Sequence, residues 1–142
     1  PVVLGDAIRL EQLVLNLINN AVDAMEAGNS GLQMVLEVVT AVEKDRVVVE
    51  VIDNGVGIEK SKLEHIFEPF YTTKEVGKGT GLGLSISHGI AIDHKGKILC
   101  ESTPGEGSKF VFNIPLINKD ERQSVDERNL KKILEKIKTT NR

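Results

Sequence analysis

Residues 77–85 read GKGTGLGLS, with a glycine at every second position from Gly77 to Gly83 and an apolar run directly after them. Glycine loses more conformational freedom on folding than any other residue, so such a loop costs stability unless the backbone needs a positive φ or a close approach. Backbone amides of glycine-rich loops that lead into a helix commonly bind phosphate groups. The stretch therefore predicts a phosphate-binding loop.

Two familiar phosphate loops do not fit this stretch. The pattern GxxxxGK[ST] requires glycine at the position of Thr72 and serine or threonine at the position of Gly79. The pattern GxGxxG, started at Gly77, requires glycine at the position of Leu82. A phosphate loop of another kind is expected.

The sequence around the loop predicts alternating helices and strands. Asp6 is a good N-cap for a first helix, whose apolar residues recur at helical spacing until glycines end the pattern. Valine-rich runs predict strands, and residues 67–81, with Pro69 and no periodicity, predict a long loop or lid. The predicted helices span residues 7–27, 61–66 and 82–93, and the predicted strands span 33–42, 46–53, 97–102 and 109–115.

The composition suits one globular domain. A chain of 142 residues can bury a single core, and no apolar run approaches the roughly 20 residues of a membrane span. The net charge of -3 divides unevenly, because residues 118–142 carry eight basic and five acidic side chains, which leaves -6 for the first 117 residues. An acidic body argues against a nucleic-acid partner.

The single cysteine, Cys100, excludes an internal disulfide and fits a reducing compartment. The first residues lack the pattern of a secretory signal, and the missing initiator methionine is typical of a fragment or a processed chain. We therefore expect a cytoplasmic domain without direct membrane contact, and leave open whether the full-length protein is anchored in a membrane.

The first predicted helix has an unusual polar face. At 100° per residue, five amide and carboxylate side chains fall within an arc of roughly 100°: Gln12, Asn16, Asn19, Asn20 and Asp23. A solvated face usually carries Lys and Glu, which are better helix formers than Asn and Asp. Oxygens one turn apart, at Asn16 and Asn20, can ligate Mg²⁺, which takes the rest of its shell from water and a substrate's phosphates. Hydrogen bonding of this face to neighbouring loops is the alternative.

The stretch DNGVGI places the carboxylate of Asp53 at the end of a predicted strand. Asp53 could accept a hydrogen bond from an amino group such as that of adenine, while Gly55 and Gly57 let a flat ring approach the backbone. A simple turn that ends the strand is the alternative. Further along, the aromatic residues of FEPFYTTK, residues 67–74, predict an anchor for one end of the lid.

Four blocks follow one another along the chain: NLINNAVDA (16–24), DNGVGI (53–58), FEPFYTTK (67–74) and GTGLGLS (79–85). They resemble the N box, first glycine box, F box and second glycine box of the ATP-binding catalytic domain of sensor histidine kinases. This Bergerat-fold family is shared with gyrase-type topoisomerases, heat-shock chaperones and mismatch-repair ATPases. GEGSKFVFNIP (105–115) resembles the family's closing turn and last strand, so the resemblance extends from about residue 3 to residue 116.

The resemblance implies an α/β two-layer sandwich, the Bergerat ATP-binding fold, with helices on one face of a mixed, largely antiparallel sheet and ATP held under a lid. It assigns residues 1–117 to the catalytic domain, with the lid at about 67–83. Residues 118–142 are expected to form a polar linker and an amphipathic helix, which packs on its own domain, on another domain or on a second chain, or frays. Its apolar stripe consists of Leu130, Ile133, Leu134 and Ile137.

Matching positions imply the roles of individual residues. Asn20 is the implied Mg²⁺ ligand, Asn16 lies near the phosphates, and Asp53 reads adenine. Lys74, which closes the F box, and Lys78 are candidates to reach the outer phosphates, although Lys78 could equally be a solvated lid residue. The implied catalytic residues are Asn16, Asn20 and Lys74. The implied nucleotide-binding residues are Asn16, Asn20, Asp53, Gly55, Gly57, Ile58, Lys74, Lys78, Gly79, Thr80, Gly81, Leu82 and Gly83.

The implied activity is transfer of the γ-phosphoryl group of Mg-ATP to a histidine on a separate dimerisation domain of the same full-length protein, with a response-regulator receiver domain as a further partner. Hydrolysing members of the family typically carry glutamate at the position of Asn16, which cannot serve as a general base. An ATP-hydrolysing relative and a non-enzymatic, nucleotide-dependent interaction module are the alternatives.

None of the chain's three histidines, His65, His88 and His94, lies in the family's acceptor context, and each is expected to be structural or solvated. The chain also departs from the family pattern. His94-Lys95-Gly96 stands where the family often has His-Gly-Gly, and Thr72-Thr73 stands where many members carry arginine. The second departure leaves the contacts to the γ-phosphate open.

Overall fold

The computed structural model describes residues 1–28, 31–74 and 76–140. Every predicted helix and strand is present, with small differences in length. In chain order the elements are α1 (Ala7–Ala27), β1 (Leu36–Glu43), β2 (Arg46–Asp53), α2 (Lys60–Leu63), α3 (Gly83–Asp93), β3 (Lys97–Thr103), β4 (Gly107–Pro115) and α4 (Lys119–Thr140).

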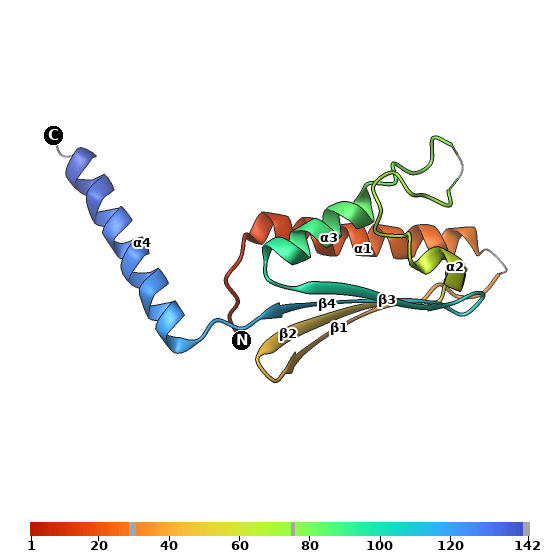
Figure 1. Ribbon diagram of the computed structural model, residues 1–142, viewed down its shortest axis with the longest axis horizontal. Helices are drawn as coiled ribbons and strands as arrows, with labels where there is room; N and C mark the ends of the chain where they lie inside the picture. The colour runs from red at the N-terminus through yellow and green to blue at the C-terminus, as the bar shows by residue number, and fades with distance from the viewer. Residues whose placement is uncertain (29–30, 75, 141–142) are drawn as a thin grey trace.

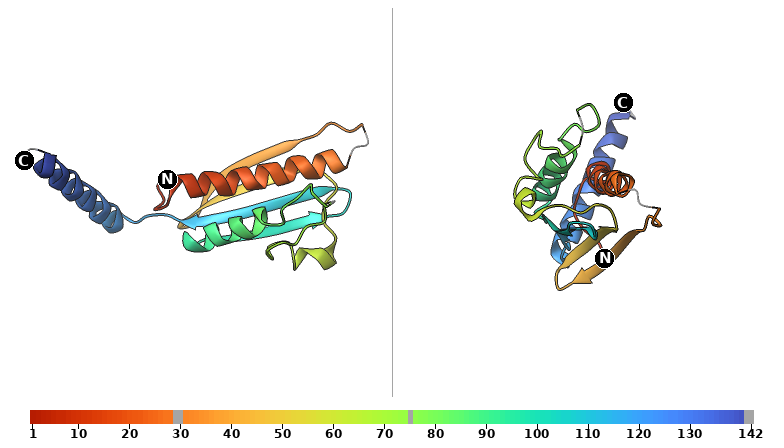
Figure 2. Two further views of the ribbon diagram at one scale, coloured as in Figure 1. Left: turned by 90° about the horizontal axis from the view of Figure 1, so that it is seen from above. Right: turned by 90° about the vertical axis from the view of Figure 1, so that its right-hand side faces the viewer.

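The four strands form one sheet in the order β1-β2-β4-β3, and each of the three pairings is antiparallel (Figure 1). Phe110 in the central strand β4 lies opposite Val51 of β2 and Cys100 of β3. Helices α1 and α3 lie side by side on one face of this sheet, as Figure 2 shows. The predicted α/β two-layer sandwich is therefore confirmed.

The core lies between the sheet and these two helices. Side chains alternate along β2 and β4 with a period of two, and along α1 with a period of 3.6, so each element buries one face. The sheet contributes Val51, Ile98, Phe110, Phe112 and Ile114, and the helices contribute Leu13, Leu17, Ala21, Ile90 and Ala91. On the edge strand β1, by contrast, Val38 and Val42 remain 46% and 51% exposed.

β1 begins at Leu36, later than the predicted residue 33. The side chain of Asn54 explains the difference, because its Oδ1 accepts a hydrogen bond from the backbone nitrogen of Val35 at 2.8 Å and its Nδ2 donates to the carbonyl of Gln33 at 2.8 Å. These bonds satisfy backbone groups that a longer strand would have paired. The valine-rich pattern alone therefore overestimates the strand.

α2 ends at Leu63, earlier than the predicted residue 66. The backbone beyond it forms successive turns, in which His65 donates to the carbonyl of Lys62 and Glu68 donates to the carbonyl of His65, both at 2.9 Å. Single turns of this kind satisfy the backbone without continuing a helix. They bring the chain to the long loop between α2 and α3.

α4 begins with a capping box. Asn118 accepts a hydrogen bond from the backbone of Glu121 at 2.7 Å, and the carboxylate of Glu121 accepts one from the backbone of Asn118 at 3.2 Å. The helix projects away from the sandwich (Figures 1 and 2), and Leu130, Ile133 and Leu134 are about half exposed. The side chain of Ile137, the last member of the predicted stripe, lies outside the described residues. No helix in the described ranges combines the length and apolar character that crossing a membrane requires.

Candidate active site

A cavity of about 880 Å³ opens between α1, α3 and the long loop before α3. Its size lies within the usual range for ligand pockets. We call the residues behind it the floor, which consists of Asp53, Val56, Gly57, Ile58 and Ser108, and we call its outer border the rim, which consists of Asp23 of α1 and loop residues 71–74 and 78–81. Figure 1 shows this loop above one end of α1.

The structure brings most of the predicted nucleotide-binding residues together. Those that line the cavity are Asn16, Asn20, Gly57, Ile58, Lys74, Lys78, Gly79, Thr80, Gly81 and Gly83. Asp53, Gly55 and Leu82 do not line it, and each is adjacent to a residue that does. Asp53 pairs across the sheet with Ser108, Gly55 precedes Val56, and Leu82 precedes Gly83.

Asn16 ties α1 to α3. Its Nδ2 donates to the carbonyl of Gly83 at 3.2 Å and to the hydroxyl of Ser87 at 3.3 Å, and that hydroxyl donates to the same carbonyl at 2.9 Å. Ser87 is fully buried. Asn16 therefore holds the first turn of α3 against α1, a structural role that its place on a polar helix face did not reveal.

Lys74 and Asp23 form an ion pair that joins the loop to α1. The side chains are 34% and 46% exposed, so the pair contributes at most about 1 kcal/mol and exchanges readily with other charged partners. The hydroxyl of Thr72 supports this geometry by accepting a hydrogen bond from the backbone of Lys74 at 3.1 Å. Sequence periodicity placed Asp23 on the polar face but could not identify its partner, which lies 51 residues away.

Asp53 is a buried carboxylate, and only one of its two oxygens has a hydrogen-bond partner among the described residues. Its Oδ1 accepts a hydrogen bond from the backbone of Gly55 at 2.8 Å, whereas its Oδ2 has no hydrogen-bond partner in the described part of the chain. Burial raises the pKa of Asp53, and backbone hydrogen bonds from Gly55 and Ser108 oppose that rise. A buried acceptor without a donor costs free energy, so this oxygen fits a donor brought by a ligand.

Gly55 and Gly57 each allow two backbone segments of the domain to approach closely. A Cβ on Gly55 would lie 2.5 Å from the carbonyl carbon of Ala24 on α1, and one on Gly57 would lie 2.1 Å from the carbonyl oxygen of Thr103. We expected these residues to let a nucleotide approach the backbone. The close approach that they permit in this structure is between backbone segments of the domain itself.

The glycines of the loop differ from one another. Gly81 has a φ of 67°, and a Cβ there would lie 2.4 Å from the carbonyl carbon of Phe70. At Gly79 a Cβ would meet the side chain of Lys74 at 2.8 Å. Gly83, at the start of α3, has open space in the direction of its missing Cβ. A Cβ on Gly83 would therefore meet open space, whereas a Cβ on any of the other glycines that line the cavity would meet neighbouring atoms.

A clasp between Phe70 and Gly81 closes the base of the loop. The backbone of Phe70 donates to the carbonyl of Gly81 at 2.8 Å. Phe70 has a φ of 66°, which is strained for a bulky residue, and its side chain is 75% exposed. This conformation could not be predicted from the residue types, since aromatic residues rarely adopt it.

Known proteins resemble this chain over most of its length. Residues 5–118 match the family model described as histidine kinase-, DNA gyrase B- and HSP90-like ATPase. The two-component sensor PprA of Pseudomonas aeruginosa is 50% identical over 118 residues, which cover 81% of this chain and 13% of PprA. Sporulation kinase E of Bacillus subtilis is 37% identical over 120 residues, which cover 84% of this chain and 15% of that kinase. This chain thus spans a small part of these relatives.

Solved structures show the same fold. The catalytic domain of histidine kinase ThkA superposes with a TM-score of 0.65 at 38% sequence identity, over 80% of this chain and 70% of that one. Full-length ShkA, solved in complex with AMPPNP, superposes with a TM-score of 0.65 at 34% identity, over 81% of this chain and 23% of ShkA.

Proposed function

Since the chain belongs to the histidine kinase-, DNA gyrase B- and HSP90-like ATPase family, whose members bind ATP, we propose that it transfers the γ-phosphoryl group of Mg-ATP to a histidine. The acceptor would lie on a dimerisation domain of the same full-length protein, and a response-regulator receiver domain would take the phosphoryl group from it. The curated relatives support this proposal, because they are longer proteins, one a two-component sensor and the other a sporulation kinase.

The observation that carries the proposal is the Oδ2 of Asp53 in the floor, which has no hydrogen-bond partner among the described residues. A carboxylate can only accept, and the exocyclic amino group of adenine is a donor of matching chemistry. Apolar side chains of Ile58, Ile66 and Leu84 line the same cavity and suit the faces of a base. The complex of ShkA with AMPPNP supports a nucleotide as the ligand of this fold.

The phosphates would lie toward the rim and the first turn of α3. Gly83 and Leu84 line the cavity there, and the first amides of a helix have no partner within it. These amides and the helix dipole favour a phosphate group, and the N-cap residue Leu82 has no polar side chain that could satisfy them. Lys74 would exchange its contact with Asp23 for a phosphate oxygen, with Lys78, Gly79, Thr80 and Gly81 beside it.

The side-chain oxygens that α1 presents to the cavity are ligands of the kind that Mg²⁺ prefers. Asn20 presents an amide group on the cavity wall beside Asn19 and Asp23, and Mg²⁺ prefers oxygen ligands while keeping several from water and phosphate. Within the described ranges, no three His, Cys, Asp or Glu side chains gather closely enough to hold a metal ion, so a nucleotide would supply much of the shell. When bound, Mg²⁺ would offset the charge of the outer phosphates.

Asn16 favours transfer over hydrolysis. Its amide cannot take a proton from water, and its nitrogen is committed to Gly83 and Ser87. The domain's contribution to catalysis would then be positioning and charge neutralisation, while the partner domain presents its imidazole in line with the γ-phosphate.

The direct test mixes this chain with γ-labelled ATP and the dimerisation domain of its own full-length protein. Acid-labile phosphohistidine on that domain is expected, and Asn20→Ala should abolish its formation while the circular dichroism spectrum stays unchanged. Gln12→Ala is the matched control, because Gln12 is exposed on the same helix face and does not line the cavity. Release of phosphate without a partner would favour the hydrolysing alternative. ATP binding with neither product would favour an interaction module, and either result would contradict the proposal.

A further inference from the structure

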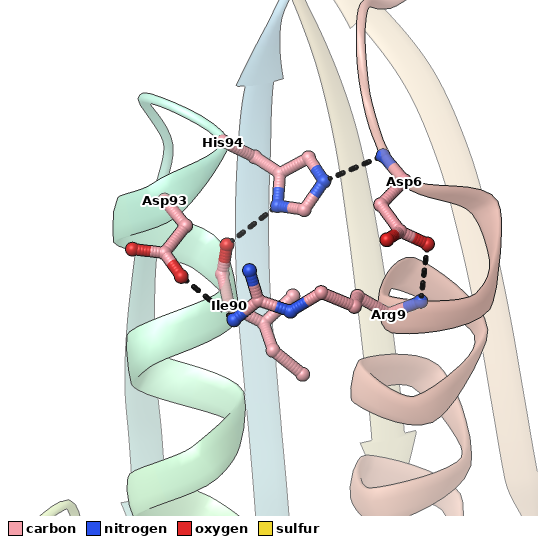
Figure 3. A network of polar contacts seen from close by, with 5 residues as sticks. All are labelled: Asp6, Arg9, Ile90, Asp93 and His94. Carbon is pink, nitrogen blue, oxygen red and sulfur yellow. Dashed lines mark hydrogen bonds and ion pairs between the residues drawn. The ribbon is translucent and has the colours of Figure 1, made fainter.

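His94 lies directly after α3 (Figure 3). Gly83 and Leu84, which line the cavity, lie at the other end of this helix. The side chain of His94 is buried, and both ring nitrogens are hydrogen-bonded to backbone. Nε2 accepts from the backbone nitrogen of Asp6 at 3.0 Å, and Nδ1 contacts the carbonyl of Ile90 at 2.7 Å. The ring thus joins the residue that precedes α1 to the last turns of α3.

The hydrogen-bond partners of His94 determine which tautomer its ring adopts. A backbone N–H can only donate and a carbonyl can only accept, so Nε2 carries the lone pair and Nδ1 carries the hydrogen. His94 is therefore neutral, in the Nδ1–H tautomer. Protonation of Nε2, or a side chain without an acceptor at that position, would break the contact with Asp6.

Further contacts make this a junction of several segments. Val3 forms a bridge with Leu116, and the backbone of Ile117 donates to the carbonyl of Val2 at 2.9 Å. Asp6 caps α1 by accepting from the backbone of Ile8 and Arg9. Residues 2–6, which we call the N-terminal segment, are therefore held by the residues that follow β4 on one side and by His94 on the other.

Two more observations at this junction concern close packing and charge. A Cβ on Gly5 would lie 2.7 Å from Cδ2 of His94, so glycine is needed for the segment to approach the ring. Arg9 of α1 forms an ion pair with Asp93 of α3 at 2.6 Å, as Figure 3 also shows. Both groups of that pair are substantially exposed, so the pair adds little to the buried contacts of His94.

α3 is consequently joined to α1 and its N-cap residue at both of its ends. Asn16 holds the first turn at Gly83, and His94 holds the last turn, about 16 Å away for a helix of 11 residues. Between them, Ser87, Ile90 and Ala91 are buried against the core. A short, well-packed helix moves as a unit, so a shift at its last turn displaces the amides of its first turn.

We propose that His94 is a positioning residue that couples the N-terminal segment to the nucleotide cavity through α3. Phosphate contacts with the first turn of α3 are favourable only while the helix keeps its place on α1, so the nucleotide binds the tied arrangement better than a shifted one. By linkage, the nucleotide and the His94 contact strengthen each other by the same factor. This inference rests on nucleotide binding in the proposed function and is independent of phosphoryl transfer.

Two substitutions test the hydrogen bonds of the two ring nitrogens one at a time. His94→Gln places an amide near the position of Nε2 and keeps an acceptor for Asp6. His94→Asn places an amide near the position of Nδ1, which keeps a donor for Ile90 and leaves Asp6 without a partner. Both variants lose the ring, and because Asn is one methylene smaller than Gln, the unfolding temperature of each variant is measured beside its ATP affinity.

The experiment measures the affinity of the chain for ATP and the hydrogen exchange of the Asp6 amide. His94→Asn is expected to weaken ATP binding by about 5-fold or more, while His94→Gln stays close to the wild type. ATP should slow exchange at Asp6 in the wild type and in His94→Gln, and should leave it unchanged in His94→Asn. A contribution of His94 to folding alone would lower the unfolding temperature of both variants without this difference.

Gly5→Ala provides an independent variant if the substitutions at position 94 prevent folding. It pushes the N-terminal segment away from an intact ring, so it should weaken ATP binding as His94→Asn does, and the double variant should bind no more weakly than either single one. Equal ATP affinities for His94→Asn, Gly5→Ala and the wild type would overturn this inference alone. A wild-type chain that binds no ATP would overturn the proposed function and this inference with it.

Discussion

The floor and the rim of the cavity use carboxylates in opposite ways. Asp53 of the floor is 4% exposed, and its Oδ2 has no partner among the described residues, whereas Asp23 of the rim is about half exposed and already paired with Lys74. A desolvated acceptor depends on a ligand for its missing hydrogen bond and so discriminates strongly between ligands. An exposed ion pair is screened by water and exchanges partners at little cost.

This difference matches the two parts of a nucleotide. The base stays unchanged through phosphoryl transfer, and a rigid, buried group suits it. The phosphates gain and lose charge as the reaction proceeds, and a mobile, solvated partner such as Lys74 can follow them. The floor should therefore determine which nucleotide binds, and the rim should determine how its phosphates are held.

Asp53→Asn should have the largest effect on binding. Loss of a charged hydrogen bond costs about 1.5 to 3 kcal/mol, or roughly 10- to 150-fold in ATP affinity. Isothermal titration calorimetry measures this loss, and GTP, which lacks the amino group at that position of the ring, serves as the control ligand. Unchanged affinity for ATP would remove Asp53 from the assignment of the base site.

The same substitution should stabilise the ligand-free domain. Burial raises the pKa of Asp53 in the folded state, so the folded chain takes up a proton more readily than the unfolded chain and its stability falls as the pH rises through the folded pKa. Asparagine carries no charge to desolvate. The thermal unfolding temperature of Asp53→Asn should therefore exceed that of the wild type at neutral pH, and the difference should shrink toward acidic pH. A variant that is less stable at neutral pH would show that the buried charge is compensated.

Gly83→Ala and Gly81→Ala should give intermediate effects of different origin. At Gly81 the positive φ and the contact with Phe70 make alanine unfavourable by about 1 to 2 kcal/mol, so the loss appears in the stability of the ligand-free domain. At Gly83 alanine meets open space and favours the helix, so any loss of ATP affinity comes from contact with the ligand. Urea unfolding and ATP titration of both variants separate the two effects. Weaker binding by Gly81→Ala than by Gly83→Ala, at equal stability, would reverse this assignment.

Substitutions of the rim pair should have the smallest effects on the ligand-free domain. Asp23→Asn and Lys74→Ala each remove an exposed ion pair, so each should lower stability by at most about 1 kcal/mol, and less in high salt. Their effects on ATP affinity should differ in sign. Asp23→Asn releases Lys74 for the phosphates and should leave affinity equal or higher, whereas Lys74→Ala should lower it. Equal losses in both variants would indicate that the pair itself, and not Lys74, supports the bound nucleotide.

Much of the fold could be predicted because its periodic patterns are strong. The apolar spacing of residues 7–27 and the valine-rich runs around Val49 reflect burial on one face, which is a local property of the sequence. The ends of elements were less predictable. The start of β1 depends on Asn54, a residue 19 positions away from the backbone nitrogen that it binds.

In the candidate site, too, the residues could be predicted from the sequence, whereas their contacts could not. Ten of the thirteen predicted nucleotide-binding residues line the cavity, because the residue types and order of the sequence blocks are specific. The partners of these residues could not be read from the blocks. Asn16 bonds to Gly83, Lys74 pairs with Asp23, and Gly57 packs on Thr103, and each contact depends on how the layers come together in the folded chain.

The clasp between Phe70 and Gly81 has a consequence for how such domains diversify. Because one backbone hydrogen bond joins both ends of the loop, a change in the number of residues between them leaves these ends in place, while Tyr71 packs against the core. For a flexible loop, each doubling of length adds only about 0.6 kcal/mol of closure entropy. Insertions and deletions between Phe70 and Gly81 can therefore change how the loop covers the nucleotide. The sandwich that binds the nucleotide would stay the same.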